Sequence, residues 1–463
     1  MTGLPHGFRL VLDRSVRCFR DGTVLVGGHP GRLITLTPDG VGEMETLLAG
    51  GPVSAAGHDL GRRLVDAGMA HPRAAGPVER AAADASVTVV LPVRDRIQAL
   101  DRCLASVGTG IPVVVVDDAS GDPGAVAEVC RRHGARLIAR TVNGGPGVAR
   151  NDGVAVVGTD LVAFVDSDCT VPAEWLRQLT WMFDDPCLGA VAPRVRPDPA
   201  GPPAVGSALS RFTGARSALD MGPDPSEVGP DRPVRYVPAA ALVVRRAALA
   251  AGFDPDLRVG EDVDLVWRLL DAGWRVRYEP SAVVWHREPS SWPALLARRY
   301  QYGTSAGPLA RRHPGRLAPV RLRPWPTAAV AAGLAGRPLA ALALVLGHAT
   351  MLARSVGRHG VPSRLAIQWS AQGAGWTLVG VGHAATMLAG PALAVGATRG
   401  RRVAVVAALL VLVPPAVDWW RRRPGLDPLR WATASIADDV AYGAGVWAGC
   451  LRSRSFGPLL PGR

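Results

Sequence analysis

The stretch Phe164-Val165-Asp166-Ser167-Asp168-Cys169 decides how the rest of the chain is interpreted. It ends an apolar run, Leu161–Val165, with two aspartates one residue apart. If this run is a buried parallel strand, alternation puts both carboxylates on one side just past its carboxyl end, where open α/β sheets bind ligands. Two oxygen ligands there suit Mg²⁺ or Mn²⁺ with a phosphorylated substrate. An isolated Asp-Ser-Asp is more often an ordinary turn with an Asx cap, so the rest of the chain must decide.

Length and cysteine usage set the broad class. The 463 residues leave room for two or three domains with a large core. Six cysteines are scattered without a Cys-x-x-Cys spacing, which favours reduced thiols over disulfides or a zinc site. The first residues lack the apolar core of a secretory signal, so we expect the N-terminus to stay on the cytoplasmic side.

The positive charge is concentrated in the last third of the chain. From Arg298 to Arg463 there are 21 arginines, 4 aspartates and no glutamate, a net +17. Since the whole chain carries +13, the first 297 residues carry −4. These arginines flank long apolar runs, whereas nucleic-acid binders usually interleave aromatic residues with basic ones on a polar face. The pattern therefore predicts contact with an anionic membrane surface and no nucleic-acid partner.

Residues 8–72 have the pattern of a small separate α+β module. Short strands are expected at 8–12, 17–20, 24–26 and 32–36, and helices at about 38–48 and 59–67. This order suggests a winged-helix-like fold. It resembles the peptide-recognition domains related to the small peptide chaperone of quinone-cofactor biosynthesis, which bind a leader peptide at a sheet edge. A packing or oligomerisation domain is the alternative. An Ala- and Pro-containing linker is expected at 73–84.

Strands and helices then alternate. Strands are expected at 86–91, 113–116, 136–139 and 161–165, with helices at 97–107 and 125–133 and a glycine turn into a further helix near Arg150. Such an alternation predicts an α/β domain with a parallel sheet over 85–299.

Five landmarks along this domain occur in the order and spacing of family 2 glycosyltransferases, which the segment Ser86–Arg299 resembles. They are Pro92-Val93-Arg94-Asp95, Val116–Ser120, the Asn143…Asn151 stretch, Asp166-Ser167-Asp168, and Gly260–Leu269 following Val237–Arg246. The resemblance implies a GT-A fold, with a mostly parallel sheet flanked by helices, and a sugar-nucleotide donor.

The resemblance also implies roles for individual residues on the donor side. Asp168 would contact Mg²⁺ or Mn²⁺, and Asp166 would take a ribose or metal-bridging position. Asp118 would bind the uracil ring and Arg150 would lie beside the base or the phosphates, with Pro92 and Arg94 in the same donor site. His286 would be either a further metal or diphosphate ligand or a histidine at the edge of the core.

The candidate catalytic base is Asp262, next to Glu261. Both follow Gly260 at a predicted helix start, where an aspartate could also be a simple N-cap. Adjacent acids raise the cost of ionising all of them, which can hold a pKa near the working range. Arg268 is expected to pair with Asp264 at i+4. A single base with direct displacement would invert the anomeric carbon.

Two regions outside these motifs also carry expectations. Residues 191–238 contain ten prolines, so we expect an irregular segment that partly contacts the acceptor. Residues 300–463 contain apolar runs at 338–353, 367–398 and 403–417 between arginines. Three or four membrane spans, or a set of in-plane helices, fit this pattern. The protein is expected at the cell membrane with its catalytic domain on the cytoplasmic side.

The three parts together resemble a transferase of a peptide-derived redox-cofactor pathway. That resemblance implies a peptide-derived acceptor, UDP-glucose as donor and a short β-1,4-glucan as product. One alternative is a membrane transferase acting on a polyprenyl phosphate or a cell-wall glycan. The other is a non-catalytic peptide-binding scaffold.

Overall fold

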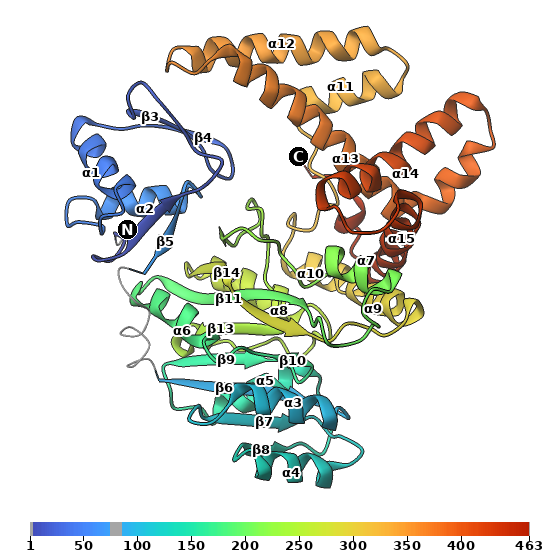
Figure 1. Ribbon diagram of the computed structural model, residues 1–463. Coiled ribbons are helices and arrows are strands. Elements are labelled where there is room, and N and C mark those ends of the chain that lie inside the picture. The colour runs from blue at the N-terminus through green and yellow to red at the C-terminus, as the bar shows by residue number, and fades with distance from the viewer. Residues whose placement is uncertain (1–2, 75–85, 463) are drawn as a thin grey trace. The chain divides into compact units, whose positions relative to one another are not determined.

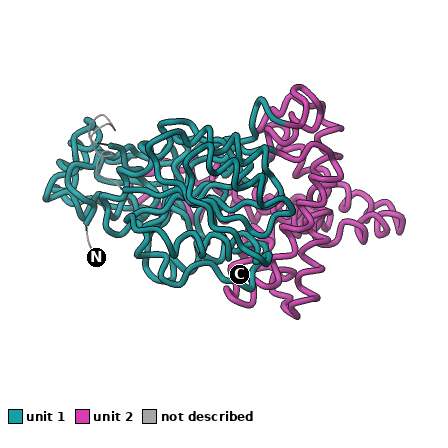
Figure 2. The backbone as a smooth tube through the Cα atoms, turned by 90° about the horizontal axis from the view of Figure 1, so that it is seen from below, with its two compact units in different colours: residues 1–201, 217–287 teal, residues 202–216, 288–463 magenta. Residues whose placement is uncertain are grey.

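The computed structural model describes residues 3–74 and 86–462. It divides into two compact units (Figure 2). The sheet unit comprises residues 1–201 and 217–287, and the helical unit comprises residues 202–216 and 288–463. Residues 75–85, which contain most of the predicted linker, lie outside the described residues.

A mixed sheet forms the centre of the sheet unit. Its order is β10-β14-β11-β13-β9-β6-β7-β8, with the short β12 paired to β14 (Figure 1). The strands are β6 (Val87–Val93), β7 (Val113–Asp117), β8 (Arg136–Ala139), β9 (Leu161–Val165), β10 (Cys169–Thr170), β11 (Leu188–Pro197), β12 (Ser226–Glu227), β13 (Ala241–Arg245) and β14 (Arg275–His286). Strands β9, β6, β7 and β8 run parallel, and β13 is antiparallel to both β9 and β11.

Helices flank this sheet. They are α3 (Ile97–Val107), α4 (Pro123–Arg132), α5 (Pro146–Ala155), α6 (Trp175–Thr180) and α8 (Glu261–Asp271). Helix α3 buries Leu100, Cys103, Leu104 and Val107, the spacing of one helical face. Strand β9 is buried along its whole length, as expected for a strand covered on both faces. The α/β architecture predicted from the alternating pattern is confirmed.

The proline-rich segment is more regular than expected. It contains β11, the helix α7 (Ala208–Arg216) and β12. Strand β11 tolerates Pro193 because the register with β14 shifts between Pro193 and Arg194, so no regular ladder hydrogen bond is required there. The expected irregular segment is therefore interrupted by these three elements.

The N-terminal module of the sheet unit has two small sheets and two helices. A three-stranded antiparallel sheet has the order β2-β3-β4, and β1 pairs with β5. The elements are β1 (Arg9–Leu12), β2 (Arg17–Phe19), β3 (Val24–Gly27), β4 (Arg32–Thr35), α1 (Pro38–Leu48), α2 (His58–Asp66) and β5 (Ala70–Arg73). The sequence pattern did not predict β5, because its pairing with β1 is a long-range contact.

Arginine–carboxylate pairs attach this module to the rest of the sheet unit. Arg62 donates from both terminal nitrogens to Asp185, at 2.8 Å each, and both side chains are buried. Arg275 at the start of β14 makes a second two-point contact with Asp66, at 2.9 and 2.8 Å. Such paired geometry fixes orientation as well as distance.

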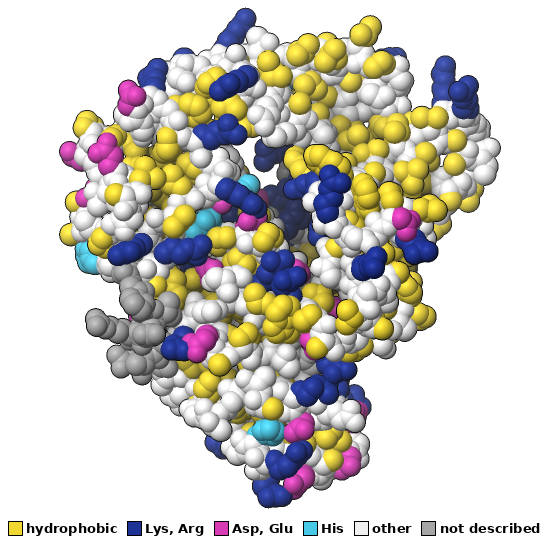
Figure 3. Space-filling model, in the orientation of Figure 1, with side chains coloured by type: hydrophobic (Ala, Val, Ile, Leu, Met, Phe, Trp, Pro, Cys, Tyr) yellow, Lys and Arg dark blue, Asp and Glu magenta, His cyan; other side chains and the backbone are white. Residues whose placement is uncertain are grey.

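The helical unit follows β14 and also includes α7. Its other helices are α9 (Trp292–Thr304), α10 (Ala306–Arg312), α11 (Pro324–Leu334), α12 (Pro338–Gly357), α13 (Ser363–Ala397), α14 (Arg401–Arg422) and α15 (Pro428–Ser453). Within the described residues, α12, α13 and α14 are long and apolar enough to cross a membrane. Figure 3 shows hydrophobic side chains over the visible faces of α12 and α14. These features indicate association with a membrane.

Replacing Arg62 should destabilise the chain strongly, because Arg62→Met leaves Asp185 buried without its cation. We expect a loss of about 3–5 kcal/mol of unfolding free energy, measured as a lowered midpoint of thermal or denaturant unfolding. The control is Arg63→Met, which removes the same charge from the exposed neighbouring position of α2. Equal midpoints for the two variants would contradict the structural role of the pair.

Candidate active site

The predicted site residues gather at the carboxyl ends of the parallel strands and at the start of α8. Asp118 follows β7, Asp166 and Asp168 follow β9, and Glu261 and Asp262 open α8. Strand β13 contributes to the same region, because Ala240 just before it accepts a hydrogen bond from the Asp166 N–H at 3.0 Å. The edge of the sheet thus brings together carboxylates from distant parts of the chain.

Arg150 links two of these carboxylates. It extends from α5, is 3% exposed, and donates to Asp166 at 2.6 Å and to Glu261 at 2.8 Å. Its guanidinium also lies 5.3 Å from the ring centre of Phe253. Gly147, the second residue of α5, permits this packing, because a Cβ there would approach Glu261 and Phe253 at 3.2 Å. Asp152, on the same helix, pairs with Arg140 at 2.8 Å.

Burial and neighbouring charges together set the pKa values of Arg150 and Glu261. Burial alone would lower the pKa of Arg150, but Asp166 and Glu261 raise it above its usual value. Burial raises the pKa of Glu261 to about 7, helped by the neighbouring Asp262 and opposed by Arg150. Glu261 can therefore change charge near neutral pH.

Asp262 is held by two backbone N–H groups. Its Oδ1 accepts from Val263 at 2.8 Å and its Oδ2 accepts from Ala239 at 3.2 Å. Burial raises its pKa, while Arg150 and these hydrogen bonds lower it. The N-cap of α8 is Gly260, so the alternative of Asp262 as a simple N-cap was wrong, and its contact with Ala239 reaches outside the helix. Asp264 pairs with Arg268 at 2.7 Å, as predicted.

Asp168 lies between an imidazole and a guanidinium. Nε2 of the buried His286 is 3.6 Å from its Oδ2, and Arg96 forms an ion pair with the same oxygen. No group of three or more His, Cys, Asp and Glu suited to a metal occurs among the residues that the structure describes. Asp168 and His286 are the residues that could hold a divalent cation here, and its other ligands would come from substrate or water.

The charge balance also fits a divalent cation. Asp166, Asp168, Glu261 and Asp262 contribute four carboxylates, and Arg150 and Arg96 contribute two cations. Arg96 is half exposed and pairs with the oxygen that a metal would use, so a cation would compete with it for Asp168. The residues present therefore fit a divalent cation at Asp168.

Asp118 stabilises the glycine turn. Its two carboxylate oxygens accept from the N–H groups of Gly144 and Gly145 at 2.7 Å each, and its own N–H donates to Val93. Gly145 has φ +90° before α5, a conformation that favours glycine. Asp118 is thus placed between β6 and the turn that leads to Arg150.

Other predicted donor-side residues are less central. Pro92 is buried within β6, and Arg94 is exposed and pairs with Asp95 at 3.4 Å. Sequence reasoning missed Arg96, although it directly follows the Pro92–Asp95 motif. It also missed the Asn151 side chain, which exchanges two 2.7 Å hydrogen bonds with the backbone of Phe253. Only the fold shows which partners these residues meet.

Folding stability should depend on pH through Glu261. Its folded-state pKa of about 7 exceeds the usual 4.5, so between these values the folded chain retains a proton that the unfolded chain has lost. Stability therefore falls as the pH rises from about 4.5 to about 7. Glu261→Gln should flatten this decline, measured as unfolding midpoints against pH in the presence of a chelator. The control Glu45→Gln, at an exposed site on α1, should retain it. An unchanged slope in Glu261→Gln would contradict the raised pKa.

Comparison with known proteins identifies the family. The sequence model of the family glycosyl transferase family 2 matches residues 88–225 of this chain. The sequence model of glycosyl transferase family group 2 matches residues 161–396. The Pre-mycofactocin glycosyltransferase of Mycobacterium tuberculosis is 38% identical, covering 99% of this chain and 98% of that protein. The N-acetylglucosaminyl-diphospho-decaprenol L-rhamnosyltransferase of the same organism is 30% identical over 42% of this chain and 73% of that protein. A mannosyltransferase structure from Pyrobaculum calidifontis, in complex with GDP-Man and Mn²⁺, aligns over 81% of this chain and 92% of its own at 18% identity and a TM-score of 0.43. The chain belongs to the family 2 glycosyltransferases and is a glycosyltransferase.

Proposed function

We propose that this enzyme transfers glucose from UDP-glucose to a peptide-derived precursor of the redox cofactor mycofactocin, and extends it into a short β-1,4-glucan. The observation that carries the proposal is the likeness to the Pre-mycofactocin glycosyltransferase along almost the whole of both chains. That alignment includes the N-terminal module and the helical unit, which a match to the catalytic fold alone would leave out.

The geometry supports an inverting displacement with Asp262 as the base. The acceptor hydroxyl gives its proton to Asp262 while its oxygen forms a bond to the anomeric carbon. The bond from that carbon to the diphosphate breaks, and the nucleoside diphosphate leaves with the electron pair. Asp262 then releases the proton to water. Ala239 and Val263 keep the carboxylate oriented through their N–H groups during these steps.

The donor side is proposed to hold Mg²⁺ or Mn²⁺ on Asp168 and His286. When bound, such a cation neutralises negative charge that develops on the leaving diphosphate. Arg150 fixes Asp166 beside this position, where the carboxylate can contact the ribose. Asp118 and the turn at Gly144 form the wall proposed for the uracil ring.

The N-terminal module is proposed to bind the peptide-derived acceptor. A groove between β4 and α2 is lined by Arg32, Leu33, Ile34, Arg63, Asp66 and Ala67. Strand β4 is an edge of the three-stranded sheet, so an extended peptide can add to it through main-chain hydrogen bonds. Arg32 and Arg63 are exposed and favour acidic peptide side chains.

A polyprenyl phosphate or cell-wall glycan is the second candidate acceptor. It is favoured by the membrane-type helices and by the likeness to the decaprenol-linked rhamnosyltransferase. That likeness covers under half of this chain, and a lipid acceptor gives no role to the groove at β4. Mass spectrometry of the purified protein with UDP-glucose, Mn²⁺ and either the peptide-derived or the lipid phosphate acceptor distinguishes them. Hexose added only to the lipid would overturn the proposal.

Asp262→Asn should abolish transfer while nucleotide binding persists, because the amide cannot accept the proton. We expect turnover to fall about 10²–10⁴-fold, with the UDP affinity measured by calorimetry changing little. Asp271→Asn, at the exposed end of α8, is the control and should keep full turnover. Full activity in Asp262→Asn would remove the base assignment.

Asp168→Asn and Arg96→Met should change Mn²⁺ binding in opposite directions. The first removes a carboxylate ligand and should weaken binding. The second removes the cation that competes for that carboxylate and should strengthen it. Electron paramagnetic resonance of free Mn²⁺ during titration measures Mn²⁺ binding by both variants in the absence of turnover. Weaker binding in Arg96→Met would contradict the competition.

Substitutions at the groove should affect the peptide acceptor selectively. Leu33→Asp and Arg63→Glu should each raise the KM for the peptide-derived acceptor about tenfold, equivalent to 1.4 kcal/mol, and leave the KM for UDP-glucose unchanged. The control is Arg17→Glu on β2, the opposite edge of the same sheet. Unchanged acceptor KM values would remove the recognition role.

A further inference from the structure

The direction of two packed helices restricts how the helical unit can meet a membrane. Helices α9 and α10 both pack against α15. Leu295 shares a buried cluster with Trp431, Arg299 donates to Asp438 at 2.7 Å, and Gly307 packs against the backbone of Gly449. These pairs progress in the same order along both segments, so the helices are parallel and the start of α15 lies beside the start of α9.

The start of α9 cannot be far from the sheet unit. Only residues 287–291 separate β14 from α9, and five residues span at most about 18 Å, less than the roughly 30 Å of a bilayer core. The run α9–α10 contains Arg298, Arg299, Arg311 and Arg312, so it does not cross. The start of α15 therefore lies on the sheet unit's side of the membrane. The chain between α10 and α15 crosses an even number of times, although it contains three helices of membrane-spanning type.

A buried cluster of charged side chains restricts the arrangement further. Arg216 on α7 forms ion pairs with Asp438 and Asp439 of α15 and lies 4.0 Å from Asp418 of α14. His383, halfway along α13, is 3.0 Å from Asp439. Both chain ends of α7 return to the sheet unit, so this cluster belongs to the same side of the membrane. Three of the four acids in the last third of the chain lie here.

Three of the apolar segments on these helices are short, whereas residues 365–382 of α13, between Arg364 and His383, number 18. Residues 384–398 and 403–417, between the cluster and the arginines at 399–402, contain 15 residues each, or about 22 Å of helix. Residues 338–353 of α12 contain 16, or about 24 Å. A span needs about 20 residues.

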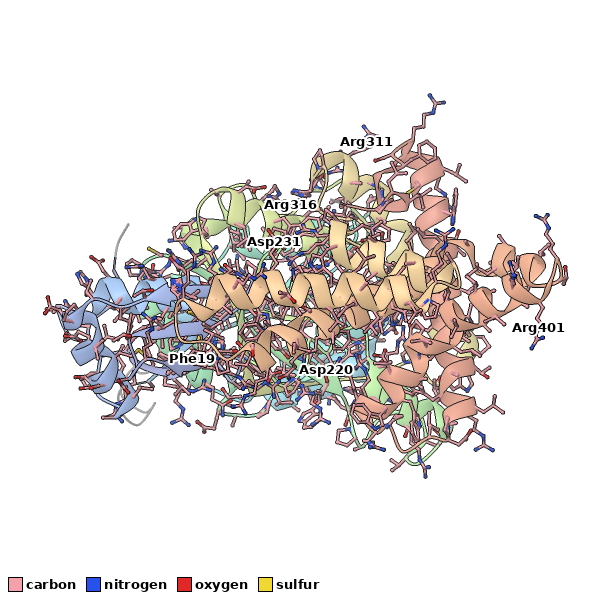
Figure 4. The ribbon with its side chains drawn as sticks, turned by 90° about the horizontal axis from the view of Figure 1, so that it is seen from above. Phe19, Asp220, Asp231, Arg311, Arg316 and Arg401 are labelled. Carbon is pink, nitrogen blue, oxygen red and sulfur yellow. The ribbon has the colours of Figure 1, made fainter. Side chains whose placement is uncertain are left out.

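The turns between these helices are strongly basic. Arg399, Arg401 and Arg402 form the turn from α13 to α14, and Arg354, Arg358 and Arg364 surround the turn from α12 to α13. Figure 4 shows Arg401 pointing away from the surrounding side chains. If either hairpin crossed, three arginines would lie on the far side of the membrane. With the sheet unit on the cytoplasmic side, this would oppose the preference for positively charged loops on that side. On the sheet unit's side of the membrane, the arginines of these turns can bind anionic lipid headgroups.

We propose that the helical unit is monotopic: α12, α13 and α14 embed in the bilayer from the sheet unit's side, and no segment reaches the opposite face. Exposed apolar side chains on these helices, including Leu342, Trp376 and Leu409, contact the acyl chains. The arginines of the turns contact lipid phosphates of the same leaflet. The bilayer thus holds the transferase at its surface.

Cysteine labelling in membrane vesicles of both orientations tests this. Thr398→Cys and Ser363→Cys, at exposed turn positions, are placed in a Cys18→Ser background and treated with a membrane-impermeant maleimide. The chain without these substitutions is labelled in parallel, and its exposed Cys18 marks the sheet unit's side. We expect neither site to react from the opposite face, although both react after solubilisation in detergent. Labelling of either site from the opposite face would overturn the proposal, as would recovery of the full chain in the soluble fraction.

Discussion

The placement of Arg150 between Asp166 and Glu261 is the interaction on which the site depends. A buried guanidinium must be neutralised, and here its two partners come from the end of β9 and the start of α8. Removing it would leave two carboxylates beside two further acids, a costly arrangement in a protein interior. The ion pairs therefore also fix the position of Asp262, whose hydrogen bond to Ala239 closes the same edge of the sheet.

Strand β14 connects the site to the N-terminal module. Arg275 at its first position binds Asp66 of α2, and His286 at its last position lies beside Asp168. Asp66 also lines the groove proposed for the acceptor peptide. Strand β14 thus runs from the groove proposed for the acceptor to the site proposed for the donor.

Charge is used differently in the two units. In the sheet unit, buried arginines organise carboxylates for a diphosphate donor. In the helical unit, Arg216, Arg299 and His383 satisfy aspartates within an apolar helix assembly, while exposed arginines remain at the turns. A count of apolar residues cannot separate these roles, and among the described residues it identifies three helices as possible membrane spans.

The sequence alone determined the strand–helix alternation, the positions of Asp118, Asp166 and Asp168 at strand ends, and the helix start at Glu261, because these follow from local periodicity and turn chemistry. It also predicted the Asp264–Arg268 pair, which is four residues apart on one helix. Only the tertiary structure decided the partners of Arg150, the approach of Arg96 to Asp168 and the pairing of β5 with β1. Arg150 and Asp166 are 16 positions apart, and the other contacts join residues 58 to 111 positions apart. No local rule relates side chains at these distances. Local sequence therefore places Asp166 and Asp168 directly after β9. The side chains that surround them are brought there by the whole fold.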